Sequence, residues 1–234
     1  MAHEENPRAT RSGSKQSLVL AFACSALLIL GVSVIRGASG QQSLGVFEGQ
    51  SDVGNTPRAG SASYDAVRHE YSVTGGGANM WGAEDAFHFV WRKVSGDVTL
   101  SAGVALLGKE GDPHRKAGLM IRQGLGSRDA YADAILHGNG LTSLQYRPYA
   151  RAETSEFGLP GAAAESLRLE RHGNVFALFV AGADRKFTRA GSVTVELHDP
   201  VYVGLAVCAH DPGALQTAVF SRVEVSGGSP APAK

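Results

Sequence analysis

Apolar and polar residues alternate along much of the chain with the period of a β-strand. Between positions 98 and 106 every second residue is apolar, and the residues between them are small or polar. Successive side chains of a strand point to opposite faces of a sheet, so this pattern predicts a half-buried strand. A second strand is predicted just before it at 87–92, with a turn at 95–97 between the two. The alternation in this second strand predicts one face that carries His88 and an opposite, buried face with Phe87, Phe89 and Trp91.

The same alternation recurs in short segments that are separated by turn residues about every ten positions. Segments 131–137 and 142–147 flank an Asn-Gly pair, which favours a tight hairpin turn. No amphipathic helix is predicted after residue 40, and we find no repeat of fixed period. About ten to twelve strands with this spacing predict an all-β, antiparallel sandwich or barrel. The other predicted strands are 64–65, 70–74, 117–123, 167–171, 175–180, 193–197, 201–209 and 215–225, with a loop at 149–165.

The first 40 residues are predicted to be a targeting segment. Residues 18–35 carry no charged side chain, and a helix of that length spans roughly 27 Å, close to the thickness of a bilayer core. Small residues at 38–40 favour a signal peptide that is cut before Gln41, whereas the long apolar run and Arg36 directly after it favour an uncleaved membrane anchor. Both alternatives predict an extracytoplasmic domain, either membrane-anchored or secreted.

Composition divides the rest of the chain into three parts. Residues 41–59 are rich in Gly, Ser, Gln and Asn and predict a linker, with an edge strand near the apolar cluster Leu44, Val46 and Phe47. Residues 60–225 contain nearly all the predicted strands and form the sandwich domain. Residues 226–234 consist mostly of Gly, Pro, Ser and Ala and predict a disordered tail.

Charge and cysteine content narrow the classes of partner. Lys and Arg number 22 and Asp and Glu number 22, so the net charge is zero. Nucleic-acid binding needs a basic footprint and is therefore not predicted. Cys208 is the single cysteine after residue 40, so no disulfide is predicted within the sandwich domain. It lies in an apolar run, where a thiol is expected to be a small buried hydrophobe, although His210 close by leaves a nucleophile as the alternative.

Catalytic and metal-binding signatures are absent from the sequence. A glycosidase needs two carboxyl groups about 5 to 9 Å apart; Glu84 and Asp85 are adjacent, and capping or loop hydrogen bonds are their alternative role. The histidines after residue 40 do not have metal-binding spacing, and several lie in turns. Asp112, Asp129 and Asp133 lack the spacing of a calcium loop, and no Gly-x-Ser-x-Gly motif is present. We therefore assign no catalytic residue, metal or cofactor.

A series of short motifs between residues 60 and 225 resembles a known bacterial domain family. In chain order they are GSASYD (60–65), YSVTGGG (71–77), WGAED (81–85), KAGLMIR (116–122), LRLER (167–171) and VYVGLA (201–206). The resemblance is to a domain of unknown function labelled regulation-of-enolase-like, which is similar to the carboxy-terminal module of β-xylosidases. It implies a two-sheet, concanavalin-A-like jelly roll with a concave face, and no agreed catalytic residues. Asn79 departs from the pattern, which has an acidic residue before the Trp81 motif.

A ligand-binding face is the functional feature that these observations favour. Sugars pack their C–H faces on aromatic rings and form hydrogen bonds with planar polar groups. Predicted strand faces opposite the core carry Arg122 together with either Gln145 or its neighbours Tyr146 and Arg147. The alternative is that both tryptophans are core residues and Arg122 is an ordinary surface or paired residue. The candidate ligand-binding residues are Trp81, Asp85, His88, Arg122, His137, Gln145 and Arg147.

The sequence therefore predicts an exported, non-catalytic module that binds a carbohydrate or a similar polar ligand on its concave face. The membrane is a further partner through residues 18–35 if that segment is not cleaved. Two alternatives remain open. One is a glycan-active hydrolase that uses Glu84 or Asp85 with a second carboxylate, and the other is a protein-interaction scaffold of the cell envelope with no small ligand.

Overall fold

The computed structural model describes residues 43–159 and 164–230. These residues form fourteen strands and no helix, which confirms the all-β prediction. Contacts divide the chain into Met1–Gly40 and Gln41–Lys234. The predicted targeting segment and its apolar run at 18–35 lie outside the described residues. In the part that is described, no helix has the length and apolar character needed to cross a bilayer.

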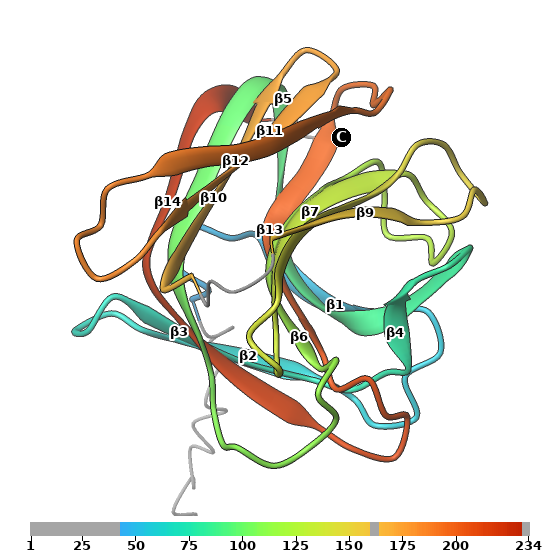
Figure 1. The fold of residues 1–234 in the computed structure, drawn as a ribbon, viewed down its shortest axis with the longest axis vertical. Coiled ribbons are helices and arrows are strands. Elements are labelled where there is room, and N and C mark those ends of the chain that lie inside the picture. Colours follow the sequence, from blue (N-terminus) through green and yellow to red (C-terminus); the bar gives the residue numbers. More distant parts are fainter. Residues whose placement is uncertain (1–42, 160–163, 231–234) are drawn as a thin grey trace, which may run out of the picture. The chain divides into compact units, whose positions relative to one another are not determined.

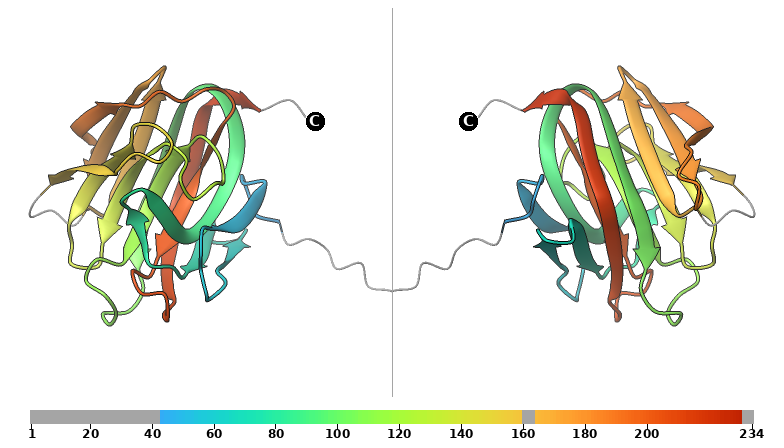
Figure 2. Two further views of the ribbon diagram at one scale, coloured as in Figure 1. Left: turned by 90° about the vertical axis from the view of Figure 1, so that its right-hand side faces the viewer. Right: turned by 90° about the vertical axis from the view of Figure 1, so that its left-hand side faces the viewer.

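One long strand, β5 (Glu84–Leu106), takes part in two layers of sheet. Its first part pairs with β1 (Gly49–Val53) and β13 (Val201–Cys208). Its second part pairs with β10 (Ser166–His172) and β14 (Gln216–Pro230). The two layers are therefore joined through a single continuous strand, which is visible as the long green ribbon in Figure 2.

The turn predicted at 95–97 is wrong, because β5 bends there without reversing direction. Gly96 has a φ of +88°, which a glycine adopts without steric cost. Its amide donates a hydrogen bond to Asp199 Oδ2 at 2.8 Å, and its carbonyl accepts one from Arg171 Nη1 at 3.3 Å. The turn-forming residues thus mark the point where the strand passes from one layer to the other.

All strand pairings among the described residues are antiparallel (Figure 1). The hairpin strand β4 (Asn79–Trp81) pairs with the start of β5. The first layer contains, in order, β1, the first part of β5, β13, β6 (Lys116–Arg122), β7 (Tyr131–His137), β8 (Thr142–Arg147) and β9 (Ser155–Leu159). The second layer contains, in order, β12 (Thr188–Thr194), β11 (Val175–Ala181), β10, the second part of β5, β14, β3 (Glu70–Gly75) and β2 (Ser61–Asp65).

Most predicted strands are present, but the strand predicted at 193–197 overlaps β12 at residues 193 and 194 alone. The pairing of β7 with β8 confirms the hairpin predicted at the Asn-Gly pair. β1 lies in the segment predicted as a linker, and β9 lies in the predicted loop at 149–165. β14 continues through five residues of the predicted tail, to Pro230, because it pairs with β5 back to Val94. Residues 231–234 lie outside the described part.

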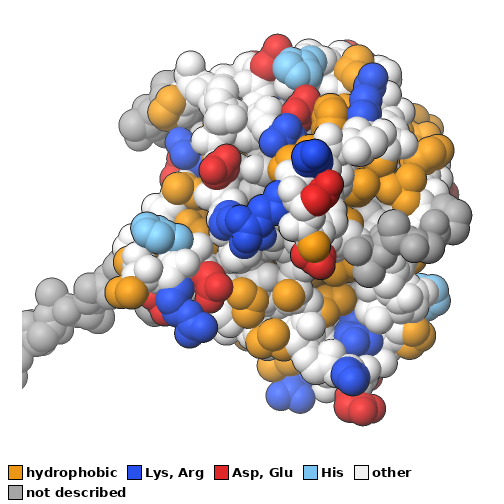
Figure 3. Space-filling view, turned by 60° about the vertical axis from the view of Figure 1, so that its left-hand side comes forward, with side chains coloured by type: hydrophobic (Ala, Val, Ile, Leu, Met, Phe, Trp, Pro, Cys, Tyr) orange, Lys and Arg blue, Asp and Glu red, His pale blue; other side chains and the backbone are white. Residues whose placement is uncertain are grey.

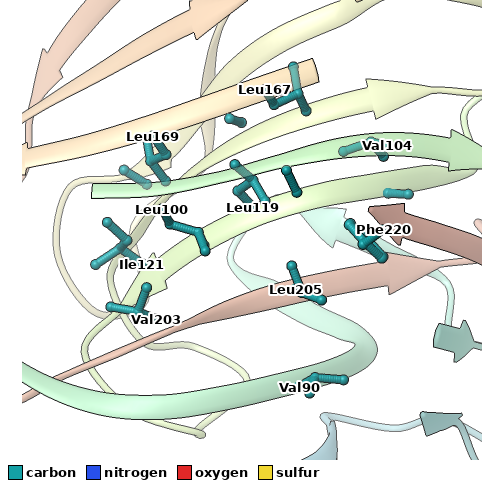
Figure 4. Packing of buried hydrophobic residues seen from close by; sticks show 14 of the residues in the cluster. Val90, Leu100, Val104, Leu119, Ile121, Leu167, Leu169, Val203, Leu205 and Phe220 are labelled. Carbon is teal, nitrogen blue, oxygen red and sulfur yellow. The ribbon is translucent and has the colours of Figure 1, made fainter. Parts of the chain in front are cut away.

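The main hydrophobic core lies between the two layers. Figure 4 shows its close packing, with Val90, Leu100, Leu119, Leu169, Val203 and Phe220 among the labelled side chains. A second, smaller cluster covers the opposite face of the first layer and includes Met80, Phe87, Phe89, Met120 and Tyr131. The first layer is therefore covered on both of its faces.

This double cover reverses the predicted facing of the first part of β5. Phe87 and Phe89 do alternate with His88, but they belong to the second cluster and not to the main core. Val90 and Val94 point into the main core instead. His88 lies on their side of the strand and is 2% exposed. An aromatic face is not necessarily the inner face when both sides of a sheet are buried.

Candidate functional site

The β4–β5 hairpin lies over the face of the first layer that points away from the main core, and it carries Trp81. Trp81 pairs with Glu84 across a turn formed by Gly82 and Ala83. The carbonyl of Gly82 accepts hydrogen bonds from Arg147 Nη2 at 2.8 Å and from Thr154 Oγ1 at 2.9 Å. The turn is therefore fixed to β8 and to the segment that leads to β9. The indole ring of Trp81 remains 38% exposed at the end of this fixed hairpin.

A buried ion-pair cluster lies beneath the hairpin. Asp85 accepts hydrogen bonds from Arg147 at 2.7 and 2.8 Å and from Arg122 at 3.3 Å, and all three side chains are fully buried. Burial raises the pKa of Asp85, and the hydrogen bonds from Arg147 and the charge of Arg122 oppose this rise. A buried carboxylate paired with two guanidinium groups holds the start of β5 against β6 and β8. These three residues thus position the hairpin.

Beside the hairpin, the described residues form a pocket of about 280 Å³. Strand alternation directs side chains of β6, β7 and β8 toward it, because Lys116 pairs with His137 and Gln145 pairs with Glu156 of β9. Two polar loops contribute His114 and His210. The lining residues are Asn79, Trp81, His114, Lys116, His137, Leu141, Gln145, Glu156 and His210.

Lys116 is the cationic centre of the pocket. Its Nζ donates hydrogen bonds to Asn79 Oδ1 at 2.8 Å, to the Met80 carbonyl at 3.0 Å and to Gln145 Oε1 at 3.4 Å. It also lies 5.5 Å from the ring centroid of Trp81. Burial lowers the pKa of Lys116, and the nearby carboxyl of Asp133 works against this decrease. The ammonium group ties the hairpin to the sheet and is saturated by oxygen acceptors.

His137, Gln145 and Glu156 form a hydrogen-bonded row on the pocket wall. Gln145 Nε2 donates to Glu156 Oε2 at 2.8 Å, and His137 Nε2 lies 3.8 Å from the same carboxylate oxygen. Burial, followed by the charge of Lys116, lowers the pKa of His137 to about 3. The imidazole is therefore neutral near pH 7. Its Nε2 also lies 3.1 Å from Ser143 Oγ, so it exchanges neutral hydrogen bonds.

Two further histidines stand at the edge of the pocket. The ring centroid of His114 lies 6.2 Å from that of His137 and 5.5 Å from that of His210. His210 Nδ1 lies 3.2 Å from Asp112 Oδ1. Across residues 43–159 and 164–230, no group of three or more His, Cys, Asp or Glu side chains is arranged to hold a metal ion. Cys208 is fully buried below this edge, and burial raises its pKa to about 11, which keeps the thiol protonated.

The seven predicted site residues separate into three groups. Trp81, His137 and Gln145 line the pocket. Asp85, Arg122 and Arg147 form the buried cluster and do not line it. His88 lies elsewhere, with its Nδ1 2.8 Å from Asp52 Oδ1 and its Nε2 3.1 Å from Gln50 Oε1, because its side of β5 faces β1 and β3.

Sequence reasoning missed several residues of the pocket. Lys116 is the first residue of β6, and its side chain lies on the same face as that of Arg122. The predicted strand began at 117, so the alternation was not extended to Lys116. Glu156 lies on β9, whose sequence SEFGL has no clear alternation. His114 and His210 lie in loops, and no sequence signal places them beside each other.

Comparisons with known proteins identify the fold and leave the family open. No family model matches the chain, and no curated protein matches it. A functionally unknown protein from Saccharomyces cerevisiae is 15% identical, with a TM-score of 0.55 over 72% of this chain and 92% of that one. The lectin UEA-II, complexed with galactose, is 7% identical, with a TM-score of 0.50 over 77% of this chain and 98% of the lectin. The described residues thus form a β-sandwich of the concanavalin-A-like jelly-roll kind.

Proposed function

We propose that the pocket binds a neutral sugar residue and that the chain is a carbohydrate-binding module. The observation that carries this proposal is the position of Trp81, which is 38% exposed beside a pocket whose walls are hydrogen-bonding side chains. A pyranose ring has apolar C–H faces and equatorial hydroxyl groups, so an aromatic ring beside polar groups complements it. Lys116 and Glu156 contribute opposite charges, which favours a neutral ligand over an acidic one.

The polar groups of the pocket are already ordered. Asn79 and Gln145 are both held by Lys116, and Gln145 is also held by Glu156. A ligand that forms hydrogen bonds with these groups loses little further side-chain entropy, because their rotamers are fixed before binding. The volume of about 280 Å³ is near the lower end of the volumes of ligand pockets. It suits one sugar ring, with the adjoining sugar residues of a glycan outside the pocket.

The carboxylates of the pocket support binding in preference to hydrolysis. Glycoside hydrolysis uses two carboxyl groups that face the same glycosidic bond. Among the described residues that line the pocket, Glu156 is the one carboxylate. Glu84 forms an ion pair with Arg128 at 3.0 Å, and Asp85 is closed off in the buried cluster. The pair considered from the sequence is therefore not available to a ligand in this pocket.

We also propose that the module acts outside the cytoplasm and belongs to the regulation-of-enolase-like family that its motifs resemble. The apolar run at 18–35 supports export, either as a cleaved signal or as an anchor. The likeness to a galactose-bound lectin supports a carbohydrate role at the level of fold only.

A glycan array probed with the full-length chain tests the sugar-binding proposal. The chain is kept in a detergent without a sugar headgroup, and bound glycans are then titrated by calorimetry. Trp81→Ala is expected to weaken binding by roughly tenfold or more, because the ligand loses its aromatic contact. Gln145→Ala is expected to weaken it as well. Tyr149→Ala is the matched control, because Tyr149 is 69% exposed and does not line the pocket.

Three outcomes would contradict this proposal. If no neutral glycan is retained, or if Trp81→Ala and Tyr149→Ala bind equally well, the pocket is not a sugar site. Release of reducing sugar that Glu156→Gln abolishes would replace binding with hydrolysis.

A further inference from the structure

A second concave site lies on the outer face of the second layer. It is a groove of about 150 Å³ whose floor is formed by small residues of adjacent strands. Ser166 of β10 pairs with Gly103 of β5, and Ser101 lies next to them on the same face. The side chains of Leu100 and Ala102, which flank Ser101 along β5, enter the main core. The groove is thus separated from the sugar pocket, which lies on the face of the first layer that points away from the main core.

Arg222 reaches this groove because of a β-bulge in β14. The register with β5 shifts between Ser221 and Glu224, and Arg222 adopts a φ of +51°. Phe220 points into the core, so strict alternation would direct Arg222 inward as well. The extra residue of the bulge turns the arginine outward instead. The Nη2 of Arg222 then lies close to Gly103, and a Cβ built on that glycine would be only 2.6 Å from this nitrogen.

Two more arginines complete the wall. The guanidinium of Arg168 stacks on the ring of Phe187, with 4.0 Å between its Cζ and the ring centroid. Its Nε is buried and has no hydrogen-bond partner among the described residues. Arg185 comes from the turn between β11 and β12 and has a φ of +58°. Left-handed conformations are costly for arginine, and such strain is concentrated at functional sites.

The arginines of this groove are poorly neutralised. Arg168 has one carboxylate contact, to Glu170 at 3.7 Å. Within the described part of the chain, the guanidinium groups of Arg185 and Arg222 form no hydrogen bond or ion pair, and Glu224 is the one acidic residue in the lining. Figure 3 shows Lys and Arg side chains gathered near the middle of the molecular face that it presents. A net positive groove therefore opens to solvent.

We propose that this arginine groove, defined by Arg168, Arg185 and Arg222, binds a tetrahedral oxyanion, namely a sulfate or phosphate group. Guanidinium groups donate paired hydrogen bonds that match such oxyanions, and stacking on Phe187 fixes one of them in advance. The hydroxyl groups of Ser101 and Ser166 on the floor supply further donors. The volume fits a single such group, either as a free ion or as an ester on a larger polar molecule.

Calorimetric titration of the full-length chain tests the groove with three probes. These are inorganic sulfate, inorganic phosphate, and a sulfated oligosaccharide compared with its desulfated form. Arg222→Gly and Arg185→Gly remove the guanidinium groups while allowing the left-handed backbone. Each is expected to weaken binding by roughly tenfold, the loss expected for one charge-assisted contact. Arg151→Gly is the matched control, because Arg151 is exposed, has a φ of +69° and lies outside the groove.

The probes distinguish the sources of the oxyanion. Binding of the inorganic ions identifies a free-ion site, and binding of the sulfated oligosaccharide alone identifies an ester on a glycan. The proposal is overturned if none of the probes binds, or if Arg222→Gly and Arg185→Gly bind as tightly as Arg151→Gly. Trp81→Ala is expected to leave binding of the inorganic ions unchanged, because Trp81 does not line the groove, so failure of the groove is distinguishable from failure of the sugar pocket.

Discussion

The sequence predicts Asp85 as a ligand-binding residue, whereas its buried ion pairs with Arg122 and Arg147 indicate a positioning role. Asp85→Asn removes the charge that compensates two buried guanidinium groups. Breaking a buried ion pair in this way leaves an uncompensated charge and costs about 3–5 kcal/mol. We therefore expect the free energy of unfolding to decrease by about that amount in urea titrations of the full-length chain.

Asp97→Asn is the control for this variant, because the Asp97 side chain is 61% exposed and contacts His172 at the surface. It is expected to change stability by less than about 1 kcal/mol. A variant Asp85→Asn with unchanged stability and lost glycan binding would show instead that the carboxylate contacts the ligand.

At the residue scale, strand alternation predicts which side chains share a face only where the strand bounds are clear. For β8, the sequence left open whether Gln145 or its neighbours Tyr146 and Arg147 face away from the core. Pairing of β8 with β7 and β9 brings Gln145 to the same pocket as His137. His88 lies away from the pocket, because alternation assigns residues to two faces but does not say which face meets the main core. Glu156 could not be predicted as a pocket residue, because β9 is a strand through its pairing with β8 and not through a pattern in its own sequence.

At the level of elements, the bend in β5 is the feature that local sequence signals described incorrectly. Ser95, Gly96 and Asp97 are turn-forming residues, yet long-range pairing with β14 extends across the bend, to Ser95 and Val94. Tertiary pairing therefore overrides the local preference. Gly96→Ala is expected to lower the free energy of unfolding by about 1–2 kcal/mol, because alanine is strained at positive φ.

The surroundings of Gly96 make this a test of backbone strain alone. No atom lies within 4 Å of a Cβ built on Gly96, so the alanine methyl group would not clash. Gly182→Ala is the matched control, because its Cβ also meets open space and its φ is not positive. Urea titration of both variants separates the strain of a positive φ from the effect of an added methyl group. Equal stabilities of the two variants would contradict the role of Gly96 in the bend.

For the whole molecule, the class of fold was predictable and the arrangement of strands was not. Regular turn spacing and alternation follow from local chemistry, and they predicted an all-β chain. The order of strands depends on contacts between distant segments, such as β1 with β5 and β14 with β3. The proposed sites depend on this order, since the pocket joins residues from Asn79 to His210 and the arginine groove joins Ser101 to Glu224.

The buried histidines link the stability of the whole molecule to pH. The pKa of His137 is lowered from an ordinary value of 6.5 to about 3, chiefly by burial, and burial lowers the pKa of His88 as well. Between about pH 3 and pH 6.5, His137 binds a proton in the unfolded chain but not in the folded chain. The free energy of unfolding is therefore highest above pH 6.5 and decreases as the pH falls, by up to about 1.4 kcal/mol per pH unit for one such histidine.

His137→Gln is expected to flatten this decrease between pH 6.5 and pH 3, because glutamine takes up no proton in either state. Urea titrations at a series of pH values measure the slope. His198→Gln is the control, because His198 is exposed in the loop after β12 and does not line the pocket. Parallel profiles for His137→Gln and the unmodified chain would mean that His137 takes up its proton in the folded state. The neutral hydrogen bonds assigned to its imidazole in the sugar pocket would then be wrong at acidic pH.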